Sequence, residues 1–388
     1  MTRVSGSWLE AKGTQLVMKT LEEAGFEAFA VGGCVRNALL GEPVADVDIS
    51  TSARPEDVLK LAKASGLKAI PTGIDHGTIT VVANGEPYEV TTYRADVETD
   101  GRRAVVRFAQ TMKEDAIRRD FTMNALYADR HGLIKDPLGG LEDLRARRFR
   151  FIQDAQTRIR EDYLRILRYF RFTAWYGNPE AGVDPEALAA IAENLDGLDH
   201  LSRERVGAEL CKLFAAPDPT VAVSVMEQTG VLHRIMPGAT TRALGPLIIH
   251  EQSMALGPDA LRRMAATGFF DGAALRLSKQ AQKQLALLQC RISDSKGLPE
   301  IAWRDGGAVA QDVAVLRAAM LEMPLASDTE AQIQAGTQAQ FPVTAKDLMP
   351  HLQGPALGKA LTKLQRFWIA SGFTLQKEAL LKLLNQEG

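Results

Sequence analysis

Hydrophobic and polar positions follow two different patterns along the chain, and the change comes near residue 140. Residues 7–24 have the spacing of an amphipathic helix, whereas the runs FEAFAV, GTITVVA and PYEVTTYR are rich in β-branched and aromatic residues, as strands are. After DPLGGLEDL the strand pattern nearly stops, and from about residue 141 the spacing is almost entirely helical. The pattern therefore predicts a region of mixed α and β structure followed by an all-α region.

Turn-forming residues divide the first region into short elements. Gly32 and Gly33 form a predicted turn between the strand FEAFAV and a short helix, VRNALLG, which Gly41 closes. The segment DVDIS, residues 46–50, predicts another strand, and NGE between two β-branched runs predicts a hairpin. A glycine turn thus lies close in the chain to two aspartates.

The composition excludes several classes of protein. With 388 residues, 46% of them apolar and 24% charged, the chain is long enough for two or more globular domains. Cys34, Cys211 and Cys290 are far apart and lack CxxC spacing, so neither a disulfide framework nor a zinc site is expected. The N-terminus has no signal-peptide pattern and no apolar run approaches the roughly 20 residues of a membrane span. We therefore expect a cytoplasmic protein without a membrane partner.

The net charge of −2 does not indicate a nucleic-acid partner, but one segment differs from the whole. Residues 142–171 contain nine arginines and five acidic residues, a local charge of +4. Such a segment is typical of a polyanion site. The alternative is a solvated helix face.

Asp46 and Asp48 lie two residues apart in the predicted strand, where side chains at i and i+2 point to the same face. A divalent cation between them would relieve their repulsion, and hard oxygen ligands favour Mg²⁺ completed by substrate phosphates. Two such ions can activate a hydroxyl and stabilise a leaving pyrophosphate. The alternative is a solvent-facing pair on an edge strand.

The neighbouring residues strengthen the phosphoryl-transfer interpretation. Gly32 and Gly33 allow close approach of the backbone to an anion at a helix start, and Arg36 adds a forked cation for a triphosphate. Glu89, in YEVTTYR, is either a third carboxylate near the cations or an exposed strand residue.

Arginines recur every three residues in REDYLRILRYFRF, residues 160–172. Helical spacing predicts one polar row, formed by Asp162, Arg165, Arg168 and Arg171. An aspartate accepts hydrogen bonds and an arginine donates them, so the pair could address the Watson–Crick edge of cytosine or adenine. An ordinary ladder of ion pairs has the same spacing.

The segment EDAIRRDFTMNAL, residues 114–126, is a second charged cluster. Arg119, next to Arg118, could bind phosphate, and Asp120 or Asn124 could bind a ribose hydroxyl. A solvated helix face is the alternative.

These motifs, taken in order, resemble the class II tRNA nucleotidyltransferases, or CCA-adding enzymes, of the tRNA nucleotidyltransferase/poly(A) polymerase family. The matching segments cover roughly residues 25–213, and residues 344–364 are weakly similar to the family's C-terminal segment. They are VGGCVRNALLG, DVDISTSARPEDV, HGTITVV…EVTTYR, DAIRRDFTMNALY, DPLGGLEDL, REDYLRILRYFRF and LSRERVGAEL.

The resemblance implies an α+β head, a polymerase β-like nucleotidyltransferase domain with a mixed sheet and helices, followed by helical parts. The implied boundaries are a catalytic head at 1–140, a base-recognising neck at 141–213, a body at 214–325 and a tRNA-binding tail at 326–388. The implied reaction is attack of a tRNA 3′-hydroxyl on the α-phosphate of CTP, twice, and then of ATP. Pyrophosphate leaves at each step, and no obligate protein partner is evident.

The resemblance also assigns roles to residues. It implies that Asp46 and Asp48 bind Mg²⁺, that Gly33, Arg36 and Arg119 hold the nucleotide, and that Asp162 and Arg165 select the base. Arg168 and Arg171 would assist on the same helix. The segment 95–108, with Arg102 and Arg103, matches a flexible loop linked to the switch from C to A.

Two positions depart from the family pattern: Asn37 replaces a usual aspartate and Ala104 a common proline. The scattered histidines predict no attached phosphohydrolase. Three alternatives stay open at this stage. They are a bacterial poly(A) polymerase, an enzyme that adds only C or only A, and an RNA-binding protein with an inactive head.

Overall fold

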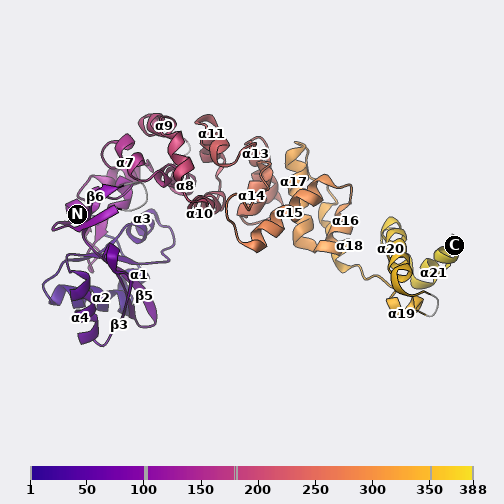
Figure 1. Cartoon of the computed structure of the whole chain (residues 1–388), viewed down its shortest axis with the longest axis horizontal. Helices are drawn as coiled ribbons and strands as arrows, with labels where there is room; N and C mark the ends of the chain where they lie inside the picture. The colour runs from indigo at the N-terminus through magenta and orange to yellow at the C-terminus, as the bar shows by residue number, and fades with distance from the viewer. Residues whose placement is uncertain (1, 100–103, 179, 181, 350–351, 387–388) are drawn as a thin grey trace. The chain divides into compact units, whose positions relative to one another are not determined.

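The order of elements along the chain agrees with the two patterns of the sequence (Figure 1). The computed structural model describes residues 2–99, 104–178, 180, 182–349 and 352–386. Within these residues the last strand, β9, ends at Lys135, and helices follow. The predicted α+β region followed by an all-α region is therefore confirmed. The predicted loop residues Arg102 and Arg103 lie outside the described residues.

The chain divides into two compact units, Met1–Pro237 and Gly238–Gly388. In its described part, the first unit contains a seven-stranded mixed sheet with the strand order β3-β4-β5-β2-β1-β8-β9. Strands β2 and β5 are parallel, and the other neighbouring pairs are antiparallel. The strands are β1 (Ala28–Val31), β2 (Asp48–Thr51), β3 (Lys68–Gly73), β4 (Thr78–Ala83), β5 (Glu86–Thr92), β8 (Tyr127–Ala128) and β9 (Ile134–Lys135). A separate pair joins β6 (Arg94–Thr99) to β7 (Ala104–Phe108).

The two faces of this sheet have different surroundings. Helices α2 (Lys12–Glu23) and α4 (Pro55–Ala64) pack against one another and against β4. Their apolar side chains meet Val81 and Val90 of the sheet. Because strand side chains alternate, Asp48 and Ser50 point away from that core, toward α5 (Met112–Ile117). The sheet therefore presents a polar row to α5.

An aromatic cluster connects the sheet region to the following helices. Phe121, fully buried, lies within 6.0 Å, between ring centroids, of Phe149, Phe151, Tyr169 and Phe172. The last two belong to α8 (Leu164–Tyr176), which packs against α10 (Arg203–Phe214) and α11 (Thr220–Gln228). The other helices here are α1 (Ser7–Glu10), α3 (Gly33–Leu40), α6 (Gly140–Arg145), α7 (Ala155–Glu161), α9 (Pro185–Ala192) and α12 (Val231–Ile235).

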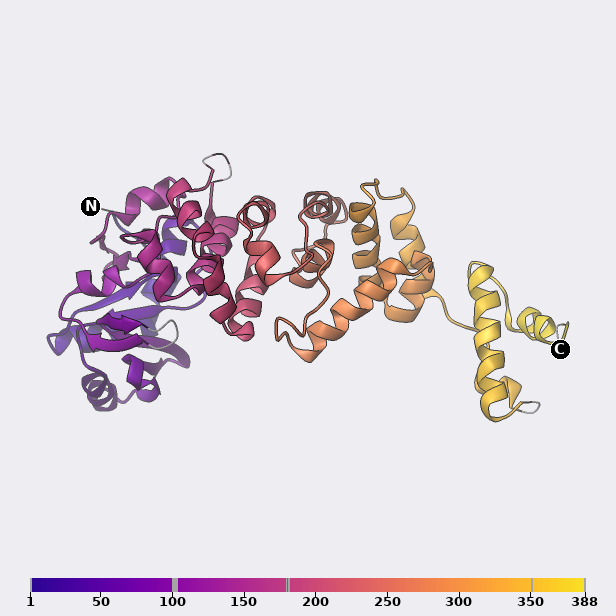
Figure 2. The same ribbon diagram turned by 45° about the horizontal axis from the view of Figure 1, so that its top comes forward.

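The second unit is helical throughout its described residues (Figure 2). Its first helices are α13 (Leu244–Ser253), α14 (Ala260–Ala266), α15 (Lys279–Ser293), α16 (Leu298–Asp305), α17 (Gly307–Met320) and α18 (Thr329–Gln338). Trp368 of α20 (Gly354–Ala370) packs edge-on to Trp303 of α16, with ring centroids 5.4 Å apart. Helices α19 (Ala345–Leu348) and α21 (Lys377–Gln386) flank α20 in sequence. No helix among the described residues is long and apolar enough to cross a bilayer.

Two predicted elements begin or end elsewhere than expected. The strand predicted at 46–50 begins at Asp48, because pairing with β5 starts at that residue and pairing with β1 starts at Ile49. Residues 160–172 are not one helix, because the extended backbone of Asp162, with φ −154° and ψ 104°, separates α7 from α8. Asp162 therefore precedes the helical row of arginines instead of belonging to it.

Candidate active site

The predicted glycine turn joins β1 to α3. Gly32 has a positive φ of 75°, which favours glycine. A Cβ atom there would lie 3.5 Å from Nη1 of Arg119, so the turn passes close to that guanidinium. Gly33 is the first residue of α3, and its N–H group belongs to the first turn, where backbone donors lack helical partners. The predicted turn therefore lies beside a predicted phosphate-binding arginine.

Two acidic side chains meet on the polar face of the sheet. Asp48 of β2 and Glu89 of β5 are register partners in the parallel pair, so both point to the same face. Burial in the surrounding protein removes water from Asp48 and raises the pKa of its carboxyl above the ordinary value. Repulsion from Glu89 is the second-largest cause of the increase. Asp46 contributes to this shift from the loop before the strand. The structure thus places Glu89 opposite Asp48 with its side chain exposed, so a role for Glu89 near the cations stays a prediction.

A cavity of about 210 Å³ lies over this acidic pair. Three arginines face the two carboxylates across it: Arg94, Arg118 and Arg119. Val31, Ile49, Thr78 and Thr91 complete its lining. Juxtaposed cationic and anionic groups of this kind suit a ligand that combines a metal ion with phosphate groups.

The acidic pair fits a divalent cation that is shared with a ligand. Among the described residues, no three Asp, Glu, His or Cys side chains form a group that could hold a metal by themselves. Magnesium needs only one or two carboxylates from the protein, since waters and substrate phosphates supply its other ligands. Asp48 and Glu89 provide hard oxygen donors of this kind, with Asp46 nearby.

Asp115, which the sequence analysis did not single out, lies behind the arginines. Its carboxylate is fully buried and accepts hydrogen bonds from Arg118 Nε at 2.8 Å and Arg119 Nη2 at 3.1 Å. Burial disfavours the charges, but the ion pairs outweigh it: the pKa of Asp115 lies well below its usual range and the pKa of Arg119 lies above it. The spacing of the acid three and four residues before two arginines was the available sequence signal.

Arg36 is buried and its guanidinium is bound by protein side chains. It donates to Asn124 Oδ1 at 2.5 Å, to Asn37 Oδ1 at 2.8 Å and to the Tyr176 hydroxyl at 3.1 Å. Its Cζ also lies 4.3 Å from the centroid of the Tyr176 ring. Burial and the nearby Arg171 lower the pKa of Arg36 from its ordinary value. Asn37, a departure from the family pattern, therefore orients Arg36 without adding a negative charge.

Asn124 links Arg36 to the next part of the network. Its Nδ2 donates to Asp120 Oδ1 at 2.9 Å, and Arg168 donates to the other oxygen of Asp120 at 2.8 and 2.6 Å. Burial disfavours a charge on Asp120, yet Arg168 and Asn124 hold the pKa of this carboxyl well below its usual range. A chain of contacts thus connects the glycine-turn helix α3 with the arginine row of α8.

Asp162 and Arg165, predicted to lie in one polar row, bind other residues instead of each other. Arg165 donates to Glu161 Oε2 at 2.5 Å and to the carbonyl oxygens of Arg158 and Arg118. Asp162 instead accepts from Arg205 Nη2 of α10 at 2.6 Å. The predicted side-by-side pairing of Asp162 and Arg165 on one helix is therefore wrong, because α8 begins only at Leu164.

Arg171 completes the row. Its Nε donates to the buried Glu209 of α10 at 2.6 Å, and its Cζ lies 4.2 Å from the centroid of the Phe172 ring. Arg205 and Glu209 both come from the motif LSRERVGAEL. The sequence analysis matched this motif but assigned no role to either residue, although each binds a predicted site residue.

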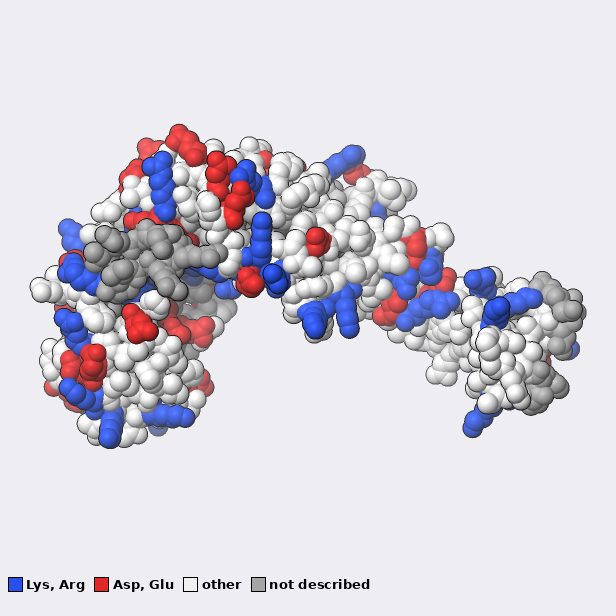
Figure 3. Space-filling view, viewed as in Figure 1, with Lys and Arg blue, Asp and Glu red and all other residues white. Residues whose placement is uncertain are grey.

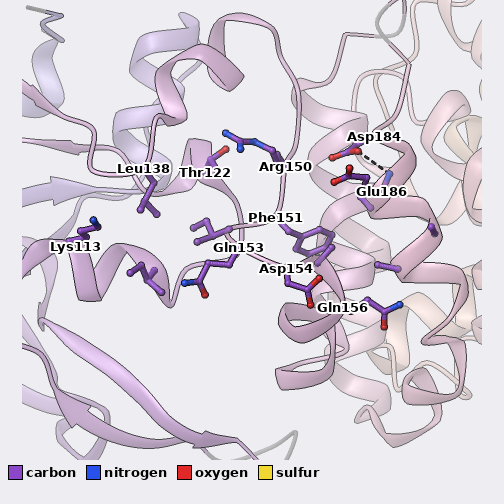
Figure 4. Close-up of a pocket in the computed structure, with 16 residues that line it drawn as sticks. Lys113, Thr122, Leu138, Arg150, Phe151, Gln153, Asp154, Gln156, Asp184 and Glu186 are labelled. Atoms are coloured by element: carbon purple, nitrogen blue, oxygen red, sulfur yellow. Dashed lines mark hydrogen bonds between the residues drawn. The ribbon is translucent and has the colours of Figure 1, made fainter.

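A second cavity, of about 800 Å³, lies elsewhere in the first unit (Figure 4). Lys113 and Arg150 line it together with Asp154, Asp184 and Glu186, and Phe151 points into it. None of the predicted site residues lines this cavity. Its size alone does not identify it as the active site.

Comparisons with known proteins identify related chains. Residues 28–150 match the poly A polymerase head domain, and residues 182–242 match the probable RNA and SrmB-binding site of polymerase A. The CCA-adding enzyme of Lacticaseibacillus paracasei is 32% identical over 95% of each chain. That of Geobacillus stearothermophilus is 42% identical, but the alignment covers 57% of this chain and 54% of that enzyme, so the chain spans about half of this relative's length.

Solved structures extend the comparison to the fold. A crystal structure of the Bacillus stearothermophilus CCA-adding enzyme in complex with CTP superposes with a TM-score of 0.74, at 28% identity and 97% coverage of both chains. The Thermotoga maritima CCA-adding enzyme complexed with tRNA has a TM-score of 0.70 over the whole of both chains. At 18% identity, the latter shows likeness of fold alone.

Proposed function

The chain belongs to the family of CCA-adding enzymes, and we propose that it adds C, C and A to the 3′ end of tRNA from CTP and ATP. Each step is attack of the terminal 3′-hydroxyl on the α-phosphate of the nucleotide, with release of pyrophosphate. The observation that carries the proposal is the cavity in which Asp48 and Glu89 face Arg118 and Arg119. This arrangement suits in-line nucleotidyl transfer, which depends on positioning and charge neutralisation.

We propose Mg²⁺ as the metal, with Asp46 and Asp48 as its ligands and Glu89 beside them. Nucleotidyltransferases of this family generally use a divalent metal. Bound there, the metal would neutralise phosphate charge and favour deprotonation of the attacking hydroxyl. The protein's own part is to hold Asp48 and Glu89 on one face of the sheet through the parallel pairing of β2 and β5, with Asp46 in the loop before β2.

The nucleotide's phosphates would lie against Arg119 and the first turn of α3, which begins at Gly33. Arg118 lines the same cavity. Arg36 would act on the nucleotide from its position between Asn37 and Asn124, where four hydrogen bonds and two aromatic rings fix the guanidinium.

Base selection would use Asp162, Arg165, Arg168 and Arg171. Asp162 can accept from the exocyclic amine of cytosine or adenine, and its Oδ2 is oriented by Arg205. Arg165, now bound to Glu161, would turn to donate to a ring nitrogen or carbonyl. Arg168 and Arg171 are fixed by Asp120 and Glu209, so they would hold the rim of the base site.

The tRNA would contact the helical remainder of the chain. Helix α20 carries Lys359, Lys363 and Arg366 at i, i+4 and i+7 and has no acidic residue. Figure 3 shows basic side chains over the C-terminal helices on the face drawn. Clusters of this kind bind phosphate backbones. We retain the division into head, neck, body and tail at residues 140, 213 and 325, and a cytoplasmic location, as parts of the proposal.

The product distinguishes the proposal from its alternatives. The protein is incubated with a tRNA that lacks its last three nucleotides, with CTP and ATP, and the added nucleotides are sequenced. CCA is expected. Runs of A, with CTP ignored, would indicate a poly(A) polymerase, and CC alone or A alone would indicate a partial activity. Binding of tRNA without any pyrophosphate release would indicate an inactive head.

A further inference from the structure

We propose that Asp115 is a positioning residue that fixes Arg118 and Arg119 relative to the strand that carries Asp48. The inference rests on the proposed function, because it concerns how the triphosphate site is assembled. Asp115 does not line the cavity. Its position behind the arginines is what suggests that it acts through them.

The contacts of Asp115 join the end of α5 to three strands: β2, β8 and β6, from which the Arg94 N–H donates to Oδ1 at 3.4 Å. Arg118 and Arg119, the two residues that follow α5, donate to different oxygens of the carboxylate. From β8, the Tyr127 hydroxyl donates at 2.8 Å. From β2, the Ser50 hydroxyl donates at 3.1 Å. One buried side chain thus ties the phosphate-binding arginines to the sheet.

The contact between Asp115 and Ser50 affects the cavity because Ser50 lies in the same strand as Asp48. Ser50 and Asp48 are two residues apart in β2, so both side chains point to the face that carries the cavity. Asp115 therefore sets the distance between the arginines and the acidic pair through Ser50. A triphosphate that bridges a metal ion and two guanidinium groups depends on that distance.

Tyr127 reinforces the same arrangement. Its hydroxyl donates to Asp115 and accepts from Arg119 Nε at 3.3 Å, and its ring centroid lies 5.4 Å from Arg119 Cζ. Arg119 is therefore oriented on two sides. The side chains of Arg118 and Arg119 keep 15% and 18% of their surface exposed, so both remain accessible from the cavity that they line.

The test compares Asp115→Asn with a matched control in the second unit. Glu251 is also a buried carboxylate that holds two consecutive arginines, Arg262 and Arg263. Glu251→Gln removes a similar charge far along the chain from every cavity residue. Both variants, and the wild type, are titrated with inorganic tripolyphosphate in the presence of Mg²⁺ by calorimetry, and KM values for CTP and for tRNA are measured.

For Asp115→Asn we expect the affinity for tripolyphosphate to fall about 10- to 100-fold and KM for CTP to rise in parallel, because misplacement by about 1 Å has effects of that size. KM for tRNA and the preference for CTP over UTP should stay within about twofold, since neither depends on triphosphate placement alone. Glu251→Gln should leave tripolyphosphate affinity unchanged. Equal affinity in Asp115→Asn and wild type, or an equal loss in both variants, would overturn the inference.

A milder variant keeps the test decisive where Asp115→Asn does not fold. Tyr127→Phe removes only the hydroxyl shared by Asp115 and Arg119, and it should weaken tripolyphosphate binding about threefold, the effect of one hydrogen bond. Unchanged affinity in a folded Tyr127→Phe variant would overturn the inference. Failure of the wild type to bind tripolyphosphate or to extend tRNA would instead overturn the proposed function.

Discussion

Asp48 and Glu89 face each other across the parallel strands β2 and β5, so two carboxylates from distant parts of the sequence share one surface of the sheet. Like charges directly opposite one another destabilise a sheet. The pKa of Asp48 is raised by its partial loss of water and by this repulsion. Arg119 offsets part of this repulsion, and a bound cation would offset more of it.

Asp48→Asn should abolish nucleotide addition and stabilise the metal-free protein. Loss of one metal ligand removes several kcal/mol of transition-state stabilisation, which corresponds to a rate decrease of roughly 1,000-fold. Because the folded state raises the pKa of Asp48, the ionised group opposes folding at neutral pH, and the asparagine removes that opposition. Initial rates of CTP incorporation and melting temperature at pH 7 in EDTA measure the two effects.

The melting temperature distinguishes the loss of a metal ligand from a loss of the fold. A variant that is inactive and melts at a lower temperature than wild type would contradict the electrostatic account. A variant that extends tRNA at the normal rate would contradict the assignment of Asp48 to the metal.

Glu89→Gln should shift the magnesium requirement more than the maximal rate. Glu89 lies beside Asp48 and adds negative charge to the cation site, so its neutralisation should raise the half-saturating Mg²⁺ concentration by about tenfold, equivalent to about 1.4 kcal/mol. Rates measured across a Mg²⁺ titration at saturating CTP check this. Glu86→Gln, in the same strand but at the hairpin end, is the control. Equal Mg²⁺ curves for Glu89→Gln and wild type would leave Glu89 without a role in cation binding.

Local sequence predicted those parts of the fold that depend on backbone preference. Gly41 ends α3 with a φ of 78°, as its sequence position indicated. Asn84 and Gly85 form the β4–β5 turn with φ values of 51° and 86°, as the NGE segment predicted. These features are encoded within a few residues, so the sequence was sufficient for them.

Structural features that depend on residues far apart in the sequence could not be predicted from local sequence. The separation of α7 from α8 occurs at Asp162, whose carboxylate bonds to the Leu164 N–H and to Arg205. The helical spacing continues through this point, so it does not mark the break between the two helices. Asp115 was missed for a related reason, since its binding to Ser50 and Tyr127 depends on the tertiary fold.

Asp120→Asn should destabilise the first unit most at neutral pH. The Arg168 ion pair and the Asn124 amide hold the pKa of Asp120 below its ordinary value of 3.8, so the stabilisation is fully present above about pH 4 and is lost as the pH falls further. Removing one partner of a largely buried pair costs about 2–3 kcal/mol. Urea unfolding of wild type and variant between pH 7 and pH 3 should therefore show a difference that narrows below about pH 4. A difference that stays constant or widens in acid would contradict this linkage.

Arg205→Ala should relax base selection with little effect on the fold. Arg205 orients Asp162 through a single contact of 2.6 Å, and its side chain is 41% exposed, so the loss of stability should stay below about 1 kcal/mol. An unrestrained Asp162 accepts less well from the exocyclic amine of cytosine, so kcat/KM for CTP should fall about tenfold, while misincorporation of UTP, which lacks that amine, changes less. Arg203→Ala, an exposed arginine on the same helix, should behave as wild type. If the ratio of CTP to UTP incorporation is the same in all three proteins, Asp162 does not select the base through its contact with Arg205.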